Sequence, residues 1–199
     1  MKYLLFVSAI ILCRLNLVGQ DKIVDSLKFA LKNAKHDTTR CLVYISLGEE
    51  IYGSQPDSAM RMWEKTCAIA ESNIKKNIAF KNKYLIYLAN AWNDIGFVLT
   101  NTGDLKKGLE YFEKSADIRE QLGDKLELAT SLNNIGTIYY GQGNSEKALE
   151  YYQRSLKSRI EIKDTLGIGN SYSNIGSVYD RLGDITKALD YFQKGLRLY

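Results

Sequence analysis

The chain has 199 residues, which is long enough for one or two domains with a hydrophobic core. Hydrophobic residues make up 45% of it and charged residues 25%, and this composition excludes an intrinsically disordered protein. The formal net charge of +4 falls to +2 when Lys2 and Arg14 are cleaved off with a leader segment, which is too little to indicate a nucleic-acid partner.

Residues 1–20 have the organisation of a signal peptide. Lys2 supplies the positive start, a largely apolar run from Tyr3 to Leu12 follows, and the small residue Gly19 lies near the expected cleavage site. The run is shorter than the roughly 18 apolar residues that span a bilayer, so we expect no direct membrane insertion after the signal is removed. We therefore predict export to the periplasm or another extracytoplasmic space. The alternative is an apolar N-terminal helix of a cytoplasmic protein.

The next two segments are predicted to be helical. In residues 21–37, apolar residues recur at helical spacing, and we expect an N-terminal capping helix. Residues 38–76 resemble a degenerate helix pair, with Cys41 at the beginning of its first helix and Cys67 late in its antiparallel partner. The two thiols are therefore predicted at similar heights, which allows a disulfide in an exported protein. The favoured alternative is two free buried thiols, because neither helix needs a cross-link.

A short insertion at residues 77–84 separates this degenerate first repeat from three copies of one unit. The lysines in and around the insertion are interpreted as a solvated helix face; they are Lys75, Lys76, Lys81 and Lys83. The copies are predicted at residues 85–123, 124–163 and 164–199, and we expect the last of them to have an incomplete end.

The internal duplication is visible in short segments that recur along the chain. WNDIG, LNNIG and YSNIG follow one another at a spacing of 40 residues, and residues 91–130 match residues 131–170 at 12 of 40 positions. Unrelated segments of ordinary composition would match at roughly 6% of positions, so the three units are copies of one another.

Each copy is predicted to form two helices joined by a turn. In the third repeat, Leu132, Ile135 and Tyr139 lie on the apolar stripe of a first helix, and a second stripe begins at Ala148. Gly136 lies on the first stripe and recurs at the same place in the neighbouring copies. Because a glycine inside a helix costs about 0.5–1 kcal/mol relative to alanine, its recurrence indicates that the two helices approach each other closely there.

The stretch GQGN at residues 141–144 allows two interpretations, a phosphate-binding loop or a turn between helices. Gly143 recurs in the neighbouring copies as Gly103 and Gly183, and Asn144 is replaced there by aspartate. Gly141 does not recur, and no Lys-Ser or Lys-Thr pair follows. This pattern predicts a left-handed glycine that ends the first helix and an Asn or Asp that caps the second. We therefore interpret the stretch as a turn.

These repeated residues resemble the tetratricopeptide repeat family, most clearly in YSNIGSVYDRLGDITKALDYF at residues 172–192. The resemblance implies an all-α fold, an α-solenoid of antiparallel helix hairpins wound into a right-handed superhelix. The copies have 40 residues where the family usually has 34, and they lack the usual proline at the repeat boundary. Asp124 and Asp164 are predicted to cap the following helices instead.

The same resemblance implies a concave groove that binds a protein or an extended peptide along the first helices of the repeats. Carrying over the family's groove positions gives seven candidate ligand-binding residues: Asn93, Asn133, Asn134, Tyr140, Asn170, Asn174 and Arg181. An asparagine amide offers both donors and an acceptor, which suits a peptide group. The alternative is that these amides bond to neighbouring helices and hold the repeats in register.

Catalysis is not indicated by the sequence. His36 is the single histidine, and neither a cluster of metal ligands nor a spaced pair of carboxylates is present. We therefore predict a protein that is not an enzyme and that has no catalytic residues, no metal and no cofactor.

The overall layout resembles the extracytoplasmic repeat segments of bacterial sensor kinases and related regulators. This resemblance implies a sensory or scaffold part of a larger signalling protein, with a free-standing adaptor or assembly protein as the alternative. We expect an uncapped C-terminal end, in which exposed Leu196 and Tyr199 allow self-association.

Overall fold

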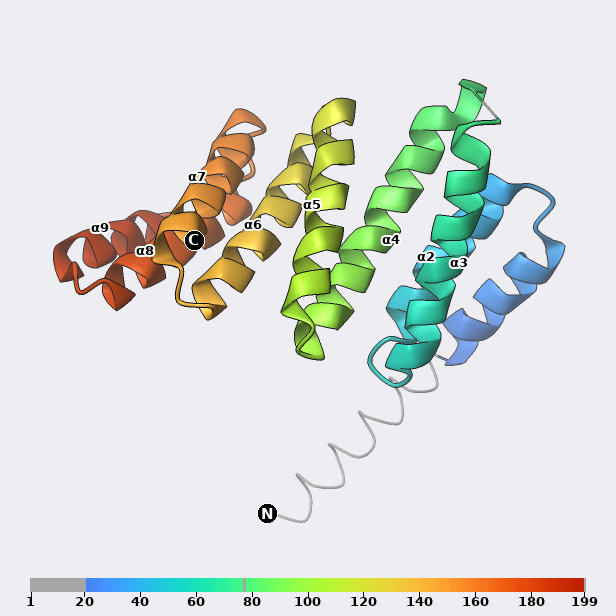
Figure 1. Cartoon of the computed structure of the whole chain (residues 1–199), viewed down its shortest axis with the longest axis horizontal. Coiled ribbons are helices and arrows are strands. Elements are labelled where there is room, and N and C mark those ends of the chain that lie inside the picture. Colours follow the sequence, from blue (N-terminus) through green and yellow to red (C-terminus); the bar gives the residue numbers. More distant parts are fainter. Residues whose placement is uncertain (1–20, 77, 199) are drawn as a thin grey trace, which may run out of the picture. The chain divides into compact units, whose positions relative to one another are not determined.

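The computed structural model describes residues 21–76 and 78–198, and these residues fold almost entirely into helices without a β-strand. The all-α prediction is therefore confirmed. The predicted signal peptide lies outside the described residues. Among the helices that are described, none is both long and apolar enough to cross a membrane. The chain divides into two compact units, one up to Tyr87 and one from Leu88 onward (Figure 1).

The first unit is built around one antiparallel helix pair. Residues 21–33 are helical and precede this pair. The elements that follow are α2 (Asp37–Ile51), α3 (Pro56–Ile74), the short 3-10 helix η1 (Ile78–Phe80) and the first residues of α4 (Lys81–Asn101). The buried Trp63 lies where a side chain at Gly48 would be, and its indole Nε1 donates to the Ile45 carbonyl over 3.4 Å. This glycine–aromatic contact resembles those of the later repeats, and the assignment of residues 38–76 as a degenerate repeat stays a prediction.

Two predicted boundaries in the first unit are wrong. The helix expected over residues 21–37 ends at residue 33, and Asp37 belongs to the first turn of α2. There its carboxylate accepts from Arg40 at 2.9 Å and from Asn73 at 3.1 Å, and a negative charge is favourable at a helix N-terminus. The insertion expected over residues 77–84 is shorter, because α4 already begins at Lys81 and buries Tyr84.

The second unit is a row of consecutive helix pairs. It contains the rest of α4, α5 (Leu105–Leu122), α6 (Lys125–Gly141), α7 (Ser145–Glu161), α8 (Thr165–Arg181) and α9 (Ile185–Leu196). From α5 to α9, each helix packs against the next one in the sequence, and α4 packs against α5, where a Cβ atom at Gly96 would lie 3.1 Å from the Phe112 ring. The pairs α4 with α5, α6 with α7 and α8 with α9 form the second, third and fourth repeats (Figure 1). The predicted α-solenoid of antiparallel helix hairpins is thus confirmed.

The turns inside the repeats follow the prediction made from GQGN. Gly143 has φ +78°, in the left-handed region, and the Asn144 side chain accepts from the Lys147 N–H at 3.1 Å to cap α7. Asp124 and Asp164 cap α6 and α8 in the same way, by accepting from backbone N–H groups at 3.4 and 3.0 Å. The stretch is therefore a turn between two helices.

The recurring glycine of the first helix has the expected packing role. A Cβ atom at Gly136 would lie 2.7 Å from the ring of Tyr152, and one at Gly176 would lie 2.8 Å from the ring of Phe192. Such distances are well inside van der Waals contact, so only glycine lets the aromatic ring of the second helix lie against the first helix.

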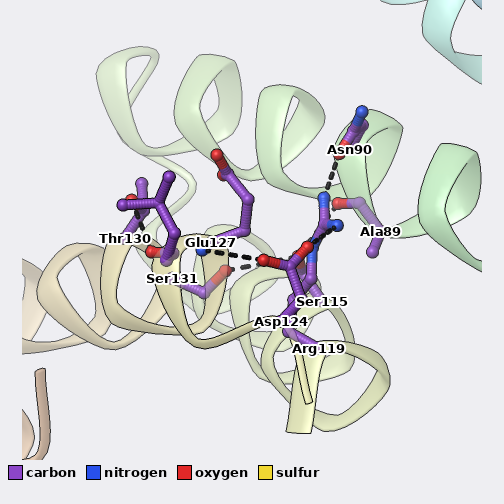
Figure 2. Close-up of polar contacts among 9 residues, drawn as sticks. Ala89, Asn90, Ser115, Arg119, Asp124, Glu127, Thr130 and Ser131 are labelled. Carbon is purple, nitrogen blue, oxygen red and sulfur yellow. Dashed lines mark hydrogen bonds and ion pairs between the residues drawn. The ribbon is translucent and has the colours of Figure 1, made fainter. Parts of the chain in front are cut away.

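A buried arginine joins three helices of the second unit, a contact that was not predicted from the sequence. Arg119, near the end of α5, donates to the Asp124 carboxylate at 2.7 Å and to the side-chain oxygen of Asn90 on α4 (Figure 2). Its side chain is only 2% exposed. Since Asp124 also caps α6, this one guanidinium ties α4, α5 and the beginning of α6 together.

Candidate functional site

The seven candidate ligand-binding residues all lie on the first helices of the repeats in the second unit. Asn93 comes from α4, the next three from α6 and the last three from α8. Asn170 and Arg181 are exposed and the others are half-buried. We call this set the first-helix face: Asn93, Asn133, Asn134, Tyr140, Asn170, Asn174 and Arg181.

Four asparagines of the first-helix face form hydrogen bonds between successive repeats. Asn134 donates from Nδ2 to Asn93 Oδ1 at 3.4 Å, and Asn174 donates to Asn133 Oδ1 at 2.7 Å. Both bonds join residues 41 positions apart. The amides therefore do contribute to the register of the helices. Each side-chain amide has two donor hydrogens and two acceptor lone pairs, so a single bond leaves capacity for a ligand.

Tyr140 and Arg181 form a second contact between repeats, at the other end of the same face. The Arg181 guanidinium lies 3.5 Å from the centre of the Tyr140 ring and donates to the Tyr140 carbonyl. The Tyr140 hydroxyl donates to the Ser177 carbonyl at 3.5 Å. Stacking and hydrogen bonding hold the arginine in one place, while its exposed side offers a positive charge at the surface.

The second helix of the third repeat, α7, bonds to α6 next to the first-helix face. The Tyr152 hydroxyl donates to Thr137 Oγ1 at 3.2 Å, and burial of the ring raises the pKa of Tyr152 above its usual value. The phenol therefore stays protonated and keeps its donor role at neutral pH. Thr137 lies one turn from Asn133 on α6, so the buried ring and the exposed face are directly connected.

Two exposed leucines extend the first-helix face and were not among the candidates. Leu126 is 47% exposed on α6 and Leu166 is 64% exposed on α8. Leu126 lies seven positions before Asn133, on the same side of the helix. The two leucines are 40 positions apart, so they occupy the same place in successive repeats. An apolar residue that recurs outside the apolar stripe facing the core is a signal from which the sequence could have predicted these exposed leucines.

A hollow in the described part of this unit lies on another face of α6. A depression of about 310 Å³ is lined by residues of α5, α6 and α7, including Leu128 and Leu132. Helical geometry places these two leucines on the opposite face of α6 from Asn133 and Asn134. The Lys125–Glu161 ion pair, with a distance of 2.7 Å, borders this depression. This depression is therefore separate from the first-helix face.

Cys41 and Cys67 are free thiols in the first unit. Cys41 is buried and Cys67 is half-buried. Burial, reinforced by Asp37 for Cys41 and by Glu71 and Glu64 for Cys67, raises the pKa of each thiol to about 12. Since the thiolate is the reactive form, both cysteines are poor nucleophiles in this environment. The disulfide that the sequence allowed is not formed in the structure.

Other ionisable groups form no constellation of metal ligands. Within residues 21–76 and 78–198, no three His, Cys, Asp or Glu side chains are grouped so that they could hold a metal ion. His36 is exposed at the N-terminal end of α2. The apolar residues Leu189 and Leu196 of α9 are exposed at the last helix, and self-association through this end stays a prediction.

Comparison with known proteins identifies the repeat type. Two family models described as tetratricopeptide repeat match residues 87–161 and residues 169–199. No curated protein sequence matches the chain.

Solved structures share the fold at low sequence identity. BtubC (BKLC) from P. vanneervenii has a TM-score of 0.72 at 18% identity, over 87% of this chain and 69% of that one. Aspartyl phosphate phosphatase F from Bacillus subtilis has a TM-score of 0.75 at 20% identity, over 84% of this chain and 42% of that one. A Rap protein complexed with Competence and Sporulation Factor has a TM-score of 0.67 at 14% identity, over 94% of this chain and 51% of that one. The present chain thus spans about half or less of the last two proteins.

Proposed function

The chain belongs to the tetratricopeptide repeat family, and we propose that it is a non-catalytic module that binds a protein or an extended peptide on the first-helix face. The observation that carries this proposal is the row of half-buried asparagines on successive first helices. An extended backbone has N–H and C=O groups at regular intervals, and a row of amides can donate to and accept from them at successive repeats.

The surroundings of the asparagines suit such a ligand. Leu126 and Leu166 offer exposed apolar contacts one to two turns before the asparagines, and Arg181 offers a positive charge near the other end of the face. A peptide lying across the first helices would meet apolar, amide and cationic groups in turn. The complex of a Rap protein with Competence and Sporulation Factor is a further support, because it is a protein of similar fold in complex with a factor.

We propose further that the module works outside the cytoplasm, as the sensory or scaffold part of a larger bacterial signalling protein. The support is the signal-peptide organisation of residues 1–20, together with the layout shared with extracytoplasmic repeat segments. A free-standing adaptor without signalling output is the alternative. Mass spectrometry of the chain isolated from cells tests the first part, since export predicts a mature N-terminus near residue 21.

Ligand binding is tested by separating the amides from the exposed leucines. Immobilised protein captures partners from an extracytoplasmic extract, and the captured proteins are compared between the wild type and two double variants. Asn134→Ala with Asn174→Ala removes both inter-repeat donors, and Leu126→Ser with Leu166→Ser leaves every described hydrogen bond of the face intact. We expect both variants to lose the partner, and the leucine variant to keep the wild-type melting temperature.

The matched control is Gln153→Ala, because Gln153 is an exposed polar residue on the second helix α7. It should retain the partner. If the asparagine variant melts earlier but retains its partner and the leucine variant also retains it, the amides serve only the register and the proposal is wrong.

A further inference from the structure

The connection between α3 and α4 in the first unit exposes two large apolar side chains that are two positions apart in the sequence. Ile78 is 86% exposed and Phe80 is 49% exposed, both on the short helix η1. Ile78 is the most exposed large apolar residue in the described part of the chain. Single exposed apolar residues are common on protein surfaces, but two in one short connection form an exposed apolar point.

Four lysines surround this apolar point, and we call the six residues together the basic turn: Lys75, Lys76, Ile78, Phe80, Lys81 and Lys83. All four lysines are exposed. Between Glu71 and Asp94 the sequence contains no acidic residue. Lys76 donates to Ser72 Oγ at 3.1 Å, and the ion pairs found among the described residues involve none of the four lysines. The basic turn therefore has uncompensated positive charge.

Two of these lysines lie where a positive charge does not stabilise helix α4. Lys81 and Lys83 lie in the first turn of α4, where the partial charge of the helix is positive and cations are disfavoured. Asp37 lines a hollow together with Phe80, and its carboxylate is engaged elsewhere because it accepts from Arg40 and Asn73. Neither helix stability nor internal ion pairing explains the four lysines.

We propose that the basic turn docks the first unit on a membrane surface that carries anionic phospholipids. Lysine ammonium groups attract phosphate headgroups, while Ile78 and Phe80 enter the boundary between headgroups and acyl chains. Charge alone would also suit a nucleic acid or an acidic protein, but exposed apolar side chains flanked by lysines are the combination that binds the interface of an anionic membrane. This docking is peripheral, involves no spanning helix and is independent of ligand binding on the first-helix face.

The test is sedimentation of the full chain with vesicles of phosphatidylcholine, with and without phosphatidylglycerol. Binding should require phosphatidylglycerol and weaken at high salt. Replacing all four lysines of the basic turn by Gln should weaken binding by about fivefold per lysine, and Ile78→Ser with Phe80→Ser should weaken it by at least about tenfold. Residues 1–20 are the same in every variant, so the differences between variants report on the basic turn.

A local measurement and matched controls complete the test. Hydrogen exchange should slow over residues 78–86 when phosphatidylglycerol vesicles are added. Replacing Lys22, Lys28, Lys32 and Lys106 by Gln removes the same charge elsewhere, and Leu126→Ser with Leu166→Ser removes two other exposed apolar residues; both controls should bind like the wild type. Exchange that is unchanged over residues 78–86 overturns the proposal. Binding that depends on the lysines but not on Ile78 and Phe80 also overturns it, because the vesicles would then attract the positive charge alone and the apolar side chains would not enter the membrane.

Discussion

The second and third repeats have the same arginine near the end of their second helix but surround it differently. Arg119 is 2% exposed and bonds to Asp124 and Asn90, whereas Arg159 is 14% exposed and bonds to Asp164 at 2.6 Å. Thr130 occupies the position of Asn90 in the third repeat, and its hydroxyl donates to the Leu126 carbonyl instead. The comparison shows that one extra acceptor accompanies the deeper burial of the same charge.

An extra acceptor accompanies deeper burial because a guanidinium loses its hydration when it leaves water. An arginine has five N–H donors, and each donor that is buried without a partner costs free energy. The Nε atoms of Arg119 and Arg159 are both buried without a partner in the described part of the chain. Arg119 can be covered more completely because Asn90 satisfies a further N–H group. The Asn90 side chain therefore accompanies the deeper burial of Arg119 by supplying one more acceptor.

Removing each arginine gives the largest expected effect and the sharpest test of this difference. Arg119→Ala should lower the free energy of unfolding by about 3–5 kcal/mol, as expected for one partner of a buried ion pair. Arg159→Ala should lower it by about 1.5–3 kcal/mol, since one charged hydrogen bond to Asp164 is lost at a less buried site. Urea unfolding followed by circular dichroism measures both values.

The control for this pair is Gln153→Ala, an exposed change on α7 that should leave the unfolding free energy within about 0.5 kcal/mol of the wild type. Equal losses for the two arginine variants would contradict the role given to burial and to Asn90.

Exchanging Asn90 and Thr130, the residues at equivalent positions of the two repeats, should change stability by a smaller amount and in opposite directions. Asn90→Thr leaves a buried N–H of Arg119 unpaired and should cost about 1–3 kcal/mol. Thr130→Asn supplies the missing acceptor to Arg159 and should gain about 0.5–1.5 kcal/mol. Melting temperatures of the two variants, measured beside the wild type, test the signs. A loss of stability in both would mean that the two sites differ in more than this residue.

Much of the fold could be predicted from the sequence because it depends on local contacts that recur. Gly143 and Asn144 act within one turn of the chain, and Gly136 meets an aromatic residue 16 positions later in the same hairpin. The 40-residue period repeats these features, so each copy supports the interpretation of the others. The predicted glycine turn, cap and close helix approach were all confirmed for this reason.

The arginine contacts were missed because a cation near the end of a helix is normally interpreted as a solvated residue that favours the helix dipole. Burial of Arg119 depends on where the next repeat places Asp124 and on how close Asn90 lies, and neither distance follows from periodicity. One signal was present, since an aspartate follows each arginine by five residues in both repeats.

The candidate site shows the same limit. The family's groove positions lie on the first helices of the repeats, and Asn134 and Asn174 occur at equivalent positions of α6 and α8. Whether their amides face a neighbouring helix depends on the distance between first helices, which the sequence does not contain. The structure gives both asparagines a partner on the preceding helix and leaves ligand contact as a prediction.

The pH dependence of the third repeat gives the smallest effect. The Gly167 N–H, and after it the Arg159 guanidinium, lower the pKa of Asp164 below its ordinary value of 3.8. A carboxylate whose pKa is lower in the folded than in the unfolded chain contributes stability above its unfolded pKa, and this contribution disappears as the pH falls through the folded pKa. Asp164→Asn keeps the capping oxygen but removes the charge, so stability should fall less between about pH 5 and pH 2 than in the wild type.

Urea midpoints across this pH range measure the effect, and the wild type must be compared with the variant at every pH. Asp104, Asp184 and Glu161 also have lowered pKa values and titrate in the same window, so only the difference between the two proteins reports on Asp164. The same comparison between Arg159→Ala and the double variant Arg159→Ala with Asp164→Asn should give a smaller difference, because part of the lowering of the Asp164 pKa comes from the Arg159 guanidinium. Parallel curves for the wild type and Asp164→Asn would show that the Arg159–Asp164 contact does not depend on charge, and the comparison between the two repeats would then rest on hydrogen bonding alone.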